Sequence, residues 1–398
     1  MKKQSRILWI LNHTTLMEWE VPMLINNGFE VYVPKLLPVG PNSRTAKVTD
    51  EYDATLSIPK KDLEYLNAVN FYENNIPSEA AQIMNRYFGN CICAYIFPGL
   101  YYVLKTFQGK LFMRAFGHAG DMDYERATTT VPNQSLELSL PKSALQRLRR
   151  SIKVGINRTL NPAGIKHHNV IMDEMYSCKN RCYLAAAYSE ILSNESHFLK
   201  TRGLFMPLAL PPSILKHTDS WTGGDERVLF VCPNIDQIDY YARIYRQFKA
   251  ELGTLPHAIA GRQSLDGVED QKKTQDSSIL GYISRDELDR YMKKCSAMFY
   301  HSQEPRHLHY HPLEAIVTGL PLVFMDQGLL EKLGGSDQPG LCRTYSEARE
   351  KLERLVSGDK KLAMTIQDRQ RSILNHFDPH YCESEWKKSF IPLARKAA

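Results

Sequence analysis

The stretch HSQEPRHLHYHPLEAIVTGLPLV, residues 301–323, decides the fold of this chain. It follows one short apolar run, 297–300, and ends in another, 320–324. We therefore predict a strand, a long loop, a helix and a second strand. Pro312 suits the first helical position, because its missing N–H would have no partner there in any case. This makes His311 the predicted N-cap of the helix.

The start of that helix is the predicted phosphate-binding site, because free N–H groups and the positive end of the helix dipole attract an anion. His311 would add a hydrogen bond, and Glu314, placed in the first turn, would accept hydrogen bonds from the hydroxyls of a ribose. Two alternatives stay open. One is a structural loop with a histidine-capped helix, and the other is a metal site formed by His307, His309 and His311.

Strand and helix patterns alternate on both sides of this stretch. In the first half, strands are expected at 6–13, 29–33, 91–97, 110–116 and 182–188, with helices at 16–27 and 78–88. In the second half, strands are expected at 227–231, 257–260, 279–283, 297–300 and 320–324, with helices at 235–252, 284–294, 312–319, 345–356, 360–377 and 381–390.

This alternation predicts an α/β fold of two Rossmann-like, doubly wound domains. We place an N-terminal domain at 1–207 and a second domain at 208–378. A C-terminal helix in 379–398 would return towards the first domain. Because open parallel sheets bind ligands beyond the carboxyl ends of their strands, the ligand is expected in a cleft between the two domains.

The composition is that of an ordinary globular protein, with 398 residues, 43% hydrophobic and 24% charged side chains, and a formal net charge of +6. It excludes a disordered or fibrous chain. The mild positive charge fits an anionic substrate or a membrane surface and lacks the dense basic stripe of a nucleic-acid-binding protein. The longest apolar stretch, 91–104, is interrupted by Pro98 and Gly99, and is too short for a bilayer-spanning helix.

The start of the chain and its cysteines indicate the cellular compartment. The segment MKKQSRILWILNH has a short apolar run, which we interpret as a first strand rather than a signal peptide. The eight cysteines form no CxxC pair, as is typical of reduced thiols in the cytosol. We predict a cytoplasmic protein.

Residues 312–323 resemble the nucleotide-binding signature of GT-B glycosyltransferases, and the plan of two domains agrees with that family. The family's common Glu-x7-Glu form is absent, since Arg306 stands eight residues before Glu314. The pair His311-Pro312 instead resembles the motif of GT-B enzymes that use CMP-sugars. By overall texture the chain is most similar to the retaining β-Kdo transferases of O-antigen and capsule synthesis, where Kdo is 3-deoxy-D-manno-octulosonic acid.

This resemblance implies a donor and a site, with residues 1–207 as the acceptor domain and 208–378 as the nucleotide-sugar domain. The donor would be CMP-β-Kdo, with no further cofactor and no metal, and its phosphate would be held by His311, Pro312 and Ser302 while Glu314 holds the ribose. The acceptor would be a lipid-linked bacterial surface glycan such as lipopolysaccharide O-antigen or capsule. Alternatives are a GT-B enzyme that uses a UDP- or GDP-sugar, and a catalytically silent glycan-binding module.

Other donor-side residues follow strands of the second domain. Arg262 could bind the donor phosphate or the Kdo carboxylate, because a guanidinium fork matches both, and Gln263 follows it. Tyr282 and Ile283 lie where GT-B enzymes usually hold the base with backbone groups.

Cys232 ends the first strand of the second domain, where the resemblance implies a nucleophilic aspartate. Retention by two inversions needs a nucleophile on the sugar face opposite CMP. A cysteine at this place indicates impaired turnover, with a thioether adduct that accumulates. A small buried thiol is the alternative interpretation.

A general acid/base must also deprotonate the acceptor hydroxyl, and the candidates are His118, Asp121 and Glu190. The basic amphipathic segment 142–153 predicts either a solvated helix face or contact with anionic lipid at the inner face of the bacterial inner membrane. The chain could also be one part of a larger multidomain glycosyltransferase.

Overall fold

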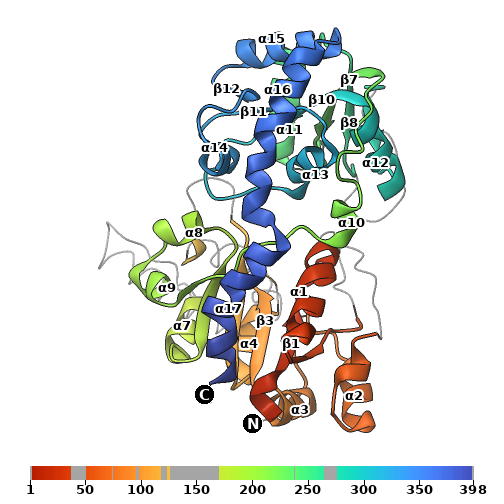
Figure 1. The fold of residues 1–398 in the computed structure, drawn as a ribbon. Helices are drawn as coiled ribbons and strands as arrows, with labels where there is room; N and C mark the ends of the chain where they lie inside the picture. The colour runs from red at the N-terminus through yellow and green to blue at the C-terminus, as the bar shows by residue number, and fades with distance from the viewer. Residues whose placement is uncertain are drawn as a thin grey trace, which may run out of the picture.

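Two parallel β-sheets, each flanked by helices, form this protein (Figure 1). The computed structural model describes residues 2–36, 51–73, 75–95, 97, 99–117, 123–125, 170–236, 238–263 and 276–396. The strand orders are β2-β1-β3-β4-β5-β6 and β12-β11-β10-β7-β8-β9. Non-consecutive neighbours in both orders require crossover connections, as in doubly wound α/β sheets.

The first sheet joins six short strands in which apolar residues predominate. Its strands are β1 Arg6–Ile10, β2 Glu30–Tyr32, β3 Asn90–Ala94, β4 Lys110–Ala115, β5 Cys182–Ala186 and β6 Gly203–Phe205. The helices of this half are α1 Thr14–Asn26, α2 Lys60–Asn67, α3 Ser78–Tyr87, α4 Leu100–Thr106, α7 Val170–Ser177, α8 Ser189–Ser193 and α9 His197–Thr201. All five residues of β1 are buried, because a central parallel strand is covered by helices on both faces.

The second sheet repeats this plan. Its strands are β7 Asp225–Val231, β8 His257–Ala260, β9 Ile279–Gly281, β10 Cys295–Tyr300, β11 Leu322–Met325 and β12 Leu341–Cys342. The helices are α10 Pro212–Leu215, α11 Asp239–Leu252, α12 Arg285–Lys294, α13 Tyr310–Thr318, α14 Leu329–Gly334, α15 Tyr345–Val356, α16 Lys360–Gln370 and α17 Pro379–Arg395, with the 3-10 helices η1 Lys2–Ser5, η2 Asp53–Thr55 and η3 Arg371–Phe377.

Several predicted element ends are confirmed by local backbone chemistry. Gly28 follows α1 at φ +80° and Gly319 follows α13 at φ +87°, both in the left-handed region that glycine adopts without strain. Ser284 and Glu287 form a capping box at the start of α12, where the sequence predicts a helix from residue 284. The predicted helix 360–377 is one α-helix continued by a 3-10 turn, and the last helix is longer than 381–390.

Helix α17 crosses back from the second half of the chain and packs on the first sheet (Figure 1). Trp386 contacts Trp19 of α1 edge-to-face, and Phe390 contacts Phe112 of β4 in the same way. The Trp386 indole N–H donates to the Pro207 carbonyl at 3.0 Å. The end of the chain is thereby fixed to the segment that joins the two halves. In the described residues, no helix is long and apolar enough to cross a membrane.

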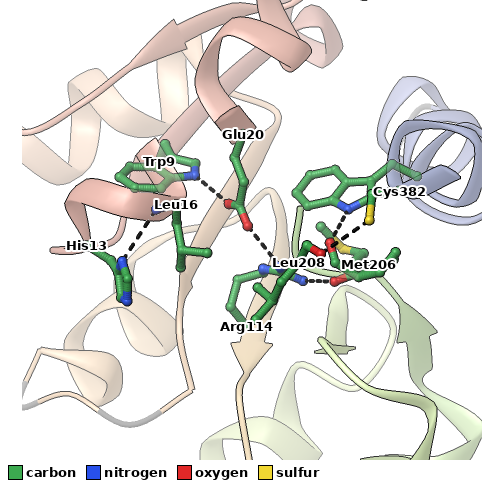
Figure 2. A network of polar contacts seen from close by, with 10 residues as sticks. Trp9, His13, Leu16, Glu20, Arg114, Met206, Leu208 and Cys382 are labelled. Carbon is green, nitrogen blue, oxygen red and sulfur yellow. Dashed lines mark hydrogen bonds and ion pairs between the residues drawn. The ribbon is translucent and has the colours of Figure 1, made fainter. Parts of the chain in front are cut away.

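A buried charge network organises this junction, and Figure 2 shows it at close range. Arg114 at the end of β4 donates to Glu20 of α1 at 2.8 Å, and their side chains are 0% and 1% exposed. The Trp9 indole N–H donates to the other oxygen of Glu20 at 2.9 Å. Arg114 also donates to the Met206 carbonyl, directly after β6. One ion pair therefore ties β1, α1 and β4 to the linker.

We expect Arg114→Met to lower the free energy of unfolding by about 3–5 kcal/mol, because it leaves the Glu20 carboxylate buried without its cation. Urea denaturation measures the change. Arg371→Ala is the matched control, since Arg371 pairs with Asp219 while both side chains are about half exposed, and its effect should stay within about 1 kcal/mol. Equal losses in the two variants would contradict the central role of the buried pair.

Candidate functional site

The predicted helix after the quoted loop forms, but it begins earlier than expected. Helix α13 starts at Tyr310, and its N-cap is His309 in an extended conformation (φ −79°, ψ 161°). The prediction of His311 as N-cap is therefore wrong, and Pro312 is the third helical residue. The cause is tertiary: the Tyr300 hydroxyl lies 3.1 Å from Nδ1 of His309 and accepts from its backbone N–H at 3.4 Å.

His311 lies inside the first turn of α13, where it is surrounded by aromatic rings. Its ring centroid is 5.3 Å from that of Tyr300 and 5.2 Å from that of His309. Burial, with smaller contributions from His301 and His307, lowers the pKa of His311 to about 3. The imidazole is neutral at physiological pH, so it would contact a phosphate as a neutral hydrogen-bond donor rather than as a cation.

His301, which directly follows β10, is the residue of this cluster that our sequence reasoning missed. Both of its ring nitrogens are shielded from solvent and have no hydrogen-bond partner among the described residues. Burial lowers its pKa to about 4, and its ring stands edge-on to Phe230 of the neighbouring strand β7. Buried polar atoms are normally paired, so this ring is available to a ligand or a water molecule. Its place at a strand end was the available signal.

The histidines of the loop contact one another and the first domain. The rings of His307 and His309 are 4.6 Å apart, and Nδ1 of His307 is hydrogen-bonded to the Phe116 carbonyl at 2.9 Å. Within the described residues, the structure contains no group of three or more histidine, cysteine, aspartate or glutamate side chains arranged to hold a metal ion.

Glu314 lies in the second turn of α13, is 7% exposed and is already paired. Its Oε1 accepts from Nη1 of Arg285 at 2.8 Å, and the other arm of Arg285 reaches Asp289 at the same distance. Burial raises the pKa of Glu314, while Arg285 opposes the rise. A ribose hydroxyl would therefore meet a carboxylate that shares its charge with a guanidinium. The ribose role stays a prediction.

Cys232 lies at the carboxyl end of β7, as predicted, and its side chain is fully buried. Its thiol lies 3.6 Å from the Tyr241 carbonyl of α11, and burial raises its pKa to about 12. The structure thus presents a closed, protonated thiol. A nucleophilic role, which stays a prediction, requires exposure and ionisation of this sulfur.

The side chain of Gln263 forms hydrogen bonds with the backbone at the carboxyl end of β7. Its amide nitrogen donates to the carbonyls of Cys232 and Gly261 at 3.0 and 2.8 Å, and its Oε1 accepts from the Ile235 N–H. Arg262 beside it is half-buried. Gln263 therefore shapes the edge of the sheet through backbone contacts.

The remaining predicted donor residues differ in accessibility. Ser302 is buried, and its hydroxyl accepts from the Glu304 N–H at 3.3 Å. Tyr282 is 71% exposed, whereas Ile283 packs partly against the core.

The loop after β10 closes against the carboxyl ends of β4 and β5. The Tyr188 hydroxyl, after β5, donates to the Leu308 carbonyl at 3.3 Å. Gly117, after β4, has φ +86°, and a Cβ there would overlap the Arg306 carbonyl. Only glycine permits this close approach. The strand ends of the two halves therefore meet through this loop.

A buried carboxyl group faces the loop at this interface. Glu195 is 3% exposed, and both of its oxygens accept from the Tyr124 N–H, at 3.2 and 3.0 Å. Its Oε1 lies 3.8 Å from Nη1 of Arg306, which is also buried. Burial is the largest cause that raises the pKa of Glu195 to about 7. Glu195 is therefore a candidate proton donor or acceptor, because its pKa lies near neutral pH and it lies where the strand ends of the two halves meet.

Of the three predicted acid/base residues, the structure describes Glu190. Glu190 is half-buried in the first turn of α8 and accepts from the Ser189 hydroxyl at 3.1 Å. His118 and Asp121 lie outside the described residues, as does the basic segment 142–153. Glu195 was missed because its sequence context, an isolated acid in a short turn, carries no recognisable motif.

No protein-family model and no curated protein matches this chain, but solved structures do. Anabaena HepE in complex with UDP-glucose has a TM-score of 0.52 at 12% identity, over 96% of this chain and 98% of that chain. Sucrose-phosphate synthase from Thermosynechococcus elongatus has a TM-score of 0.53 at 11% identity, over 96% and 97%. TarM is a weaker match, with a TM-score of 0.46 over 75% of this chain and 54% of that one, and we draw nothing from it. The predicted GT-B fold is confirmed.

We expect Glu195→Gln to gain stability relative to the wild type as the pH rises from 4.5 to 8. The folded protein holds the Glu195 proton up to a pKa of about 7, whereas the unfolded chain releases it near 4.5, so the wild type loses stability through this window. The difference between these two pKa values corresponds to about 3 kcal/mol as an upper bound. Thermal unfolding of both variants across the window measures the difference. A pH-independent difference would contradict the raised pKa.

Proposed function

We propose that this chain is a glycosyltransferase that moves Kdo from CMP-β-Kdo to the non-reducing end of a lipid-linked bacterial surface glycan, with retention of configuration. The observation that supports glycosyl transfer is the GT-B fold over 96% of the chain. The choice of CMP-Kdo rests on the resemblance of His311-Pro312 and the following residues to the CMP-sugar motif. The acceptor would be met at the inner face of the membrane.

The donor phosphate is proposed to bind at the start of α13. The N–H groups of the first turn and the helix dipole supply positive potential there. His301 offers two buried nitrogens without a partner among the described residues, and His311 is neutral. Neutral donors hold an anion and then release it more readily than a fixed ion pair would. Arg262 would supply the one guanidinium, directed to the Kdo carboxylate.

Proton transfer from the acceptor is assigned to Glu195, with Glu190 as the alternative. A base is most effective when its pKa lies near the working pH, and that of Glu195 is about 7. Its carboxyl is covered by Arg306 of the opposite half, so the two halves must separate slightly before an acceptor hydroxyl can reach it. Domain opening would thus precede each turnover.

A UDP-sugar donor is the second candidate, because Anabaena HepE was solved in complex with UDP-glucose. The residues of this chain discriminate weakly between cytosine and uracil, since the nucleobase is expected to contact backbone groups near Tyr282. A catalytically silent glycan-binding module is the third candidate. Thermal unfolding in the presence of nucleotides distinguishes the three candidates.

CMP, but not UDP or GDP, is expected to raise the melting temperature. At a ligand concentration about 100-fold above Kd, binding stabilises the folded protein by about 2.7 kcal/mol. A shift with UDP alone would favour the second candidate, and no shift with any nucleotide would favour the silent module.

His311→Ala should abolish the shift that CMP produces, because it removes the imidazole in the first turn of α13 that is proposed to donate to the phosphate. His380→Ala is the matched control, since His380 is exposed on α17, and it should bind CMP as the wild type does. Circular dichroism of both variants checks that they are folded. An unchanged CMP shift in folded His311→Ala would remove the phosphate role of this residue.

Cys232 is expected to form a stable thioether with Kdo, slowly at neutral pH and faster as the pH rises, because the burial that raises its pKa to about 12 leaves little thiolate. Attack by sulfur on the anomeric carbon expels CMP. Intact mass after incubation with CMP-Kdo should increase by one Kdo residue, and Cys232→Ala should show no increase. CMP binding without any adduct would reject the nucleophile while leaving donor binding in place.

A further inference from the structure

A cavity of about 470 Å³ lies on the first domain at the edge opposite the candidate site. It is bordered by the starts of β4 and β5 and by the end of α17, whereas the candidate site lies at the carboxyl ends of the strands. Its lining includes Lys110, Cys178, Arg181, Tyr183 and Lys396. Three of these side chains are basic. Lys110 and Arg181 already donate to backbone carbonyls, so it is through their positive charge that they favour a small molecule with carboxylates.

Two cysteines meet at this cavity. Cys178 follows α7, and Cys182 is the first residue of β5. The turn between them is closed by a hydrogen bond from the Arg181 N–H to the Cys178 carbonyl at 3.0 Å, and the two sulfur atoms are 2.6 Å apart. Both are free thiols. This turn therefore holds two thiols in direct contact, with one of them facing a cavity.

The two thiols differ in access and in acidity. Cys178 is half-buried and lines the cavity, whereas Cys182 is 1% exposed. The hydrogen bond with Cys182 and the nearby Arg181 charge lower the pKa of Cys178, while the same contact and burial raise that of Cys182. Attack on an external disulfide should therefore begin at Cys178.

We propose that Cys178 and Cys182 form a redox modification site that a small carboxylate-bearing disulfide of the glutathione class oxidises. The Cys178 thiolate attacks one sulfur of glutathione disulfide, forms a mixed disulfide and expels one glutathione thiolate. The Cys182 thiol gives its proton to the expelled glutathione thiolate, and its sulfur then attacks the Cys178 sulfur and expels the second glutathione as a thiolate, which takes a proton from solvent. The protein dithiol is oxidised by two electrons, and the glutathione disulfide is reduced to two thiols.

The disulfide between Cys178 and Cys182 would fix the end of α7 to β5. Helix α7 packs beside α4, and the Tyr95 hydroxyl after β3 contacts the sulfur atoms of Met172 and Met175 on α7. Oxidation would thus restrain a helix that covers the first sheet. The proposal does not depend on the glycosyltransferase assignment, because it uses residues at the other edge of the sheet.

Treatment of the full chain with glutathione disulfide, alkylation of the remaining thiols and tryptic mass mapping test the proposal. Trypsin cleaves after Lys179 and Arg181, so the disulfide should join the peptide that ends at Lys179 to the one that begins at Cys182. Cys182→Ser should instead retain one glutathione on Cys178. Cys295→Ser, at a buried cysteine outside the pair, should behave as the wild type does.

The rate of alkylation by N-ethylmaleimide provides an independent measurement. Cys178 should react at least tenfold faster than the buried cysteines in the reduced protein, and this advantage should disappear after oxidation. The proposal is overturned if glutathione remains on Cys178 in the wild type without a linked peptide. It is also overturned if Cys178 reacts no faster than Cys232 or Cys295.

Discussion

The buried ion pair of Glu20 and Arg114 is the interaction on which the arrangement of this protein depends. A carboxylate and a guanidinium without solvent need hydrogen bonds to offset the loss of hydration. Here Trp9 donates to Glu20 and Arg114 donates to the Met206 carbonyl, while Nε of Arg114 has no hydrogen-bond partner among the described residues. Because Met206 begins the linker, the same charges that hold β4 against α1 also set the direction in which the chain leaves the first sheet. Helix α17 then covers this junction from the far end of the chain (Figures 1 and 2).

The protonation states of the side chains at the interface of the two halves follow from the exclusion of water. Burial holds His301 and His311 neutral and brings the pKa of Glu195 close to 7. Within the second half, burial beneath α11 keeps Cys232 protonated. An interface that excludes water therefore favours hydrogen-bond donors and a proton-transferring acid, while it opposes a thiolate. Opening of the contact between Glu195 and Arg306 would hydrate the Glu195 carboxyl and lower its pKa, because burial is the largest cause of the raised value.

Much of the fold could be predicted because its signals are local. Alternating apolar strands and amphipathic helices, the start of the helix at Ser284 and the helix end near Gly319 each depend on a few neighbouring residues. The start of α13 was placed wrongly because it depends on a distant contact: Tyr300 hydrogen-bonds both the backbone and the ring of His309. Proline marks a favourable helical position, but it does not decide alone where a helix begins.

The sequence by itself determined the two series of strands and helices, the loop that carries the histidines and the strand end at which Cys232 lies. Only the tertiary structure decided that Arg285 neutralises Glu314, that α11 covers Cys232, and that Glu195 faces Arg306. The reason is physical. Periodicity along the chain specifies which side chains are apolar, whereas burial, charge pairing and protonation depend on which segments meet in space.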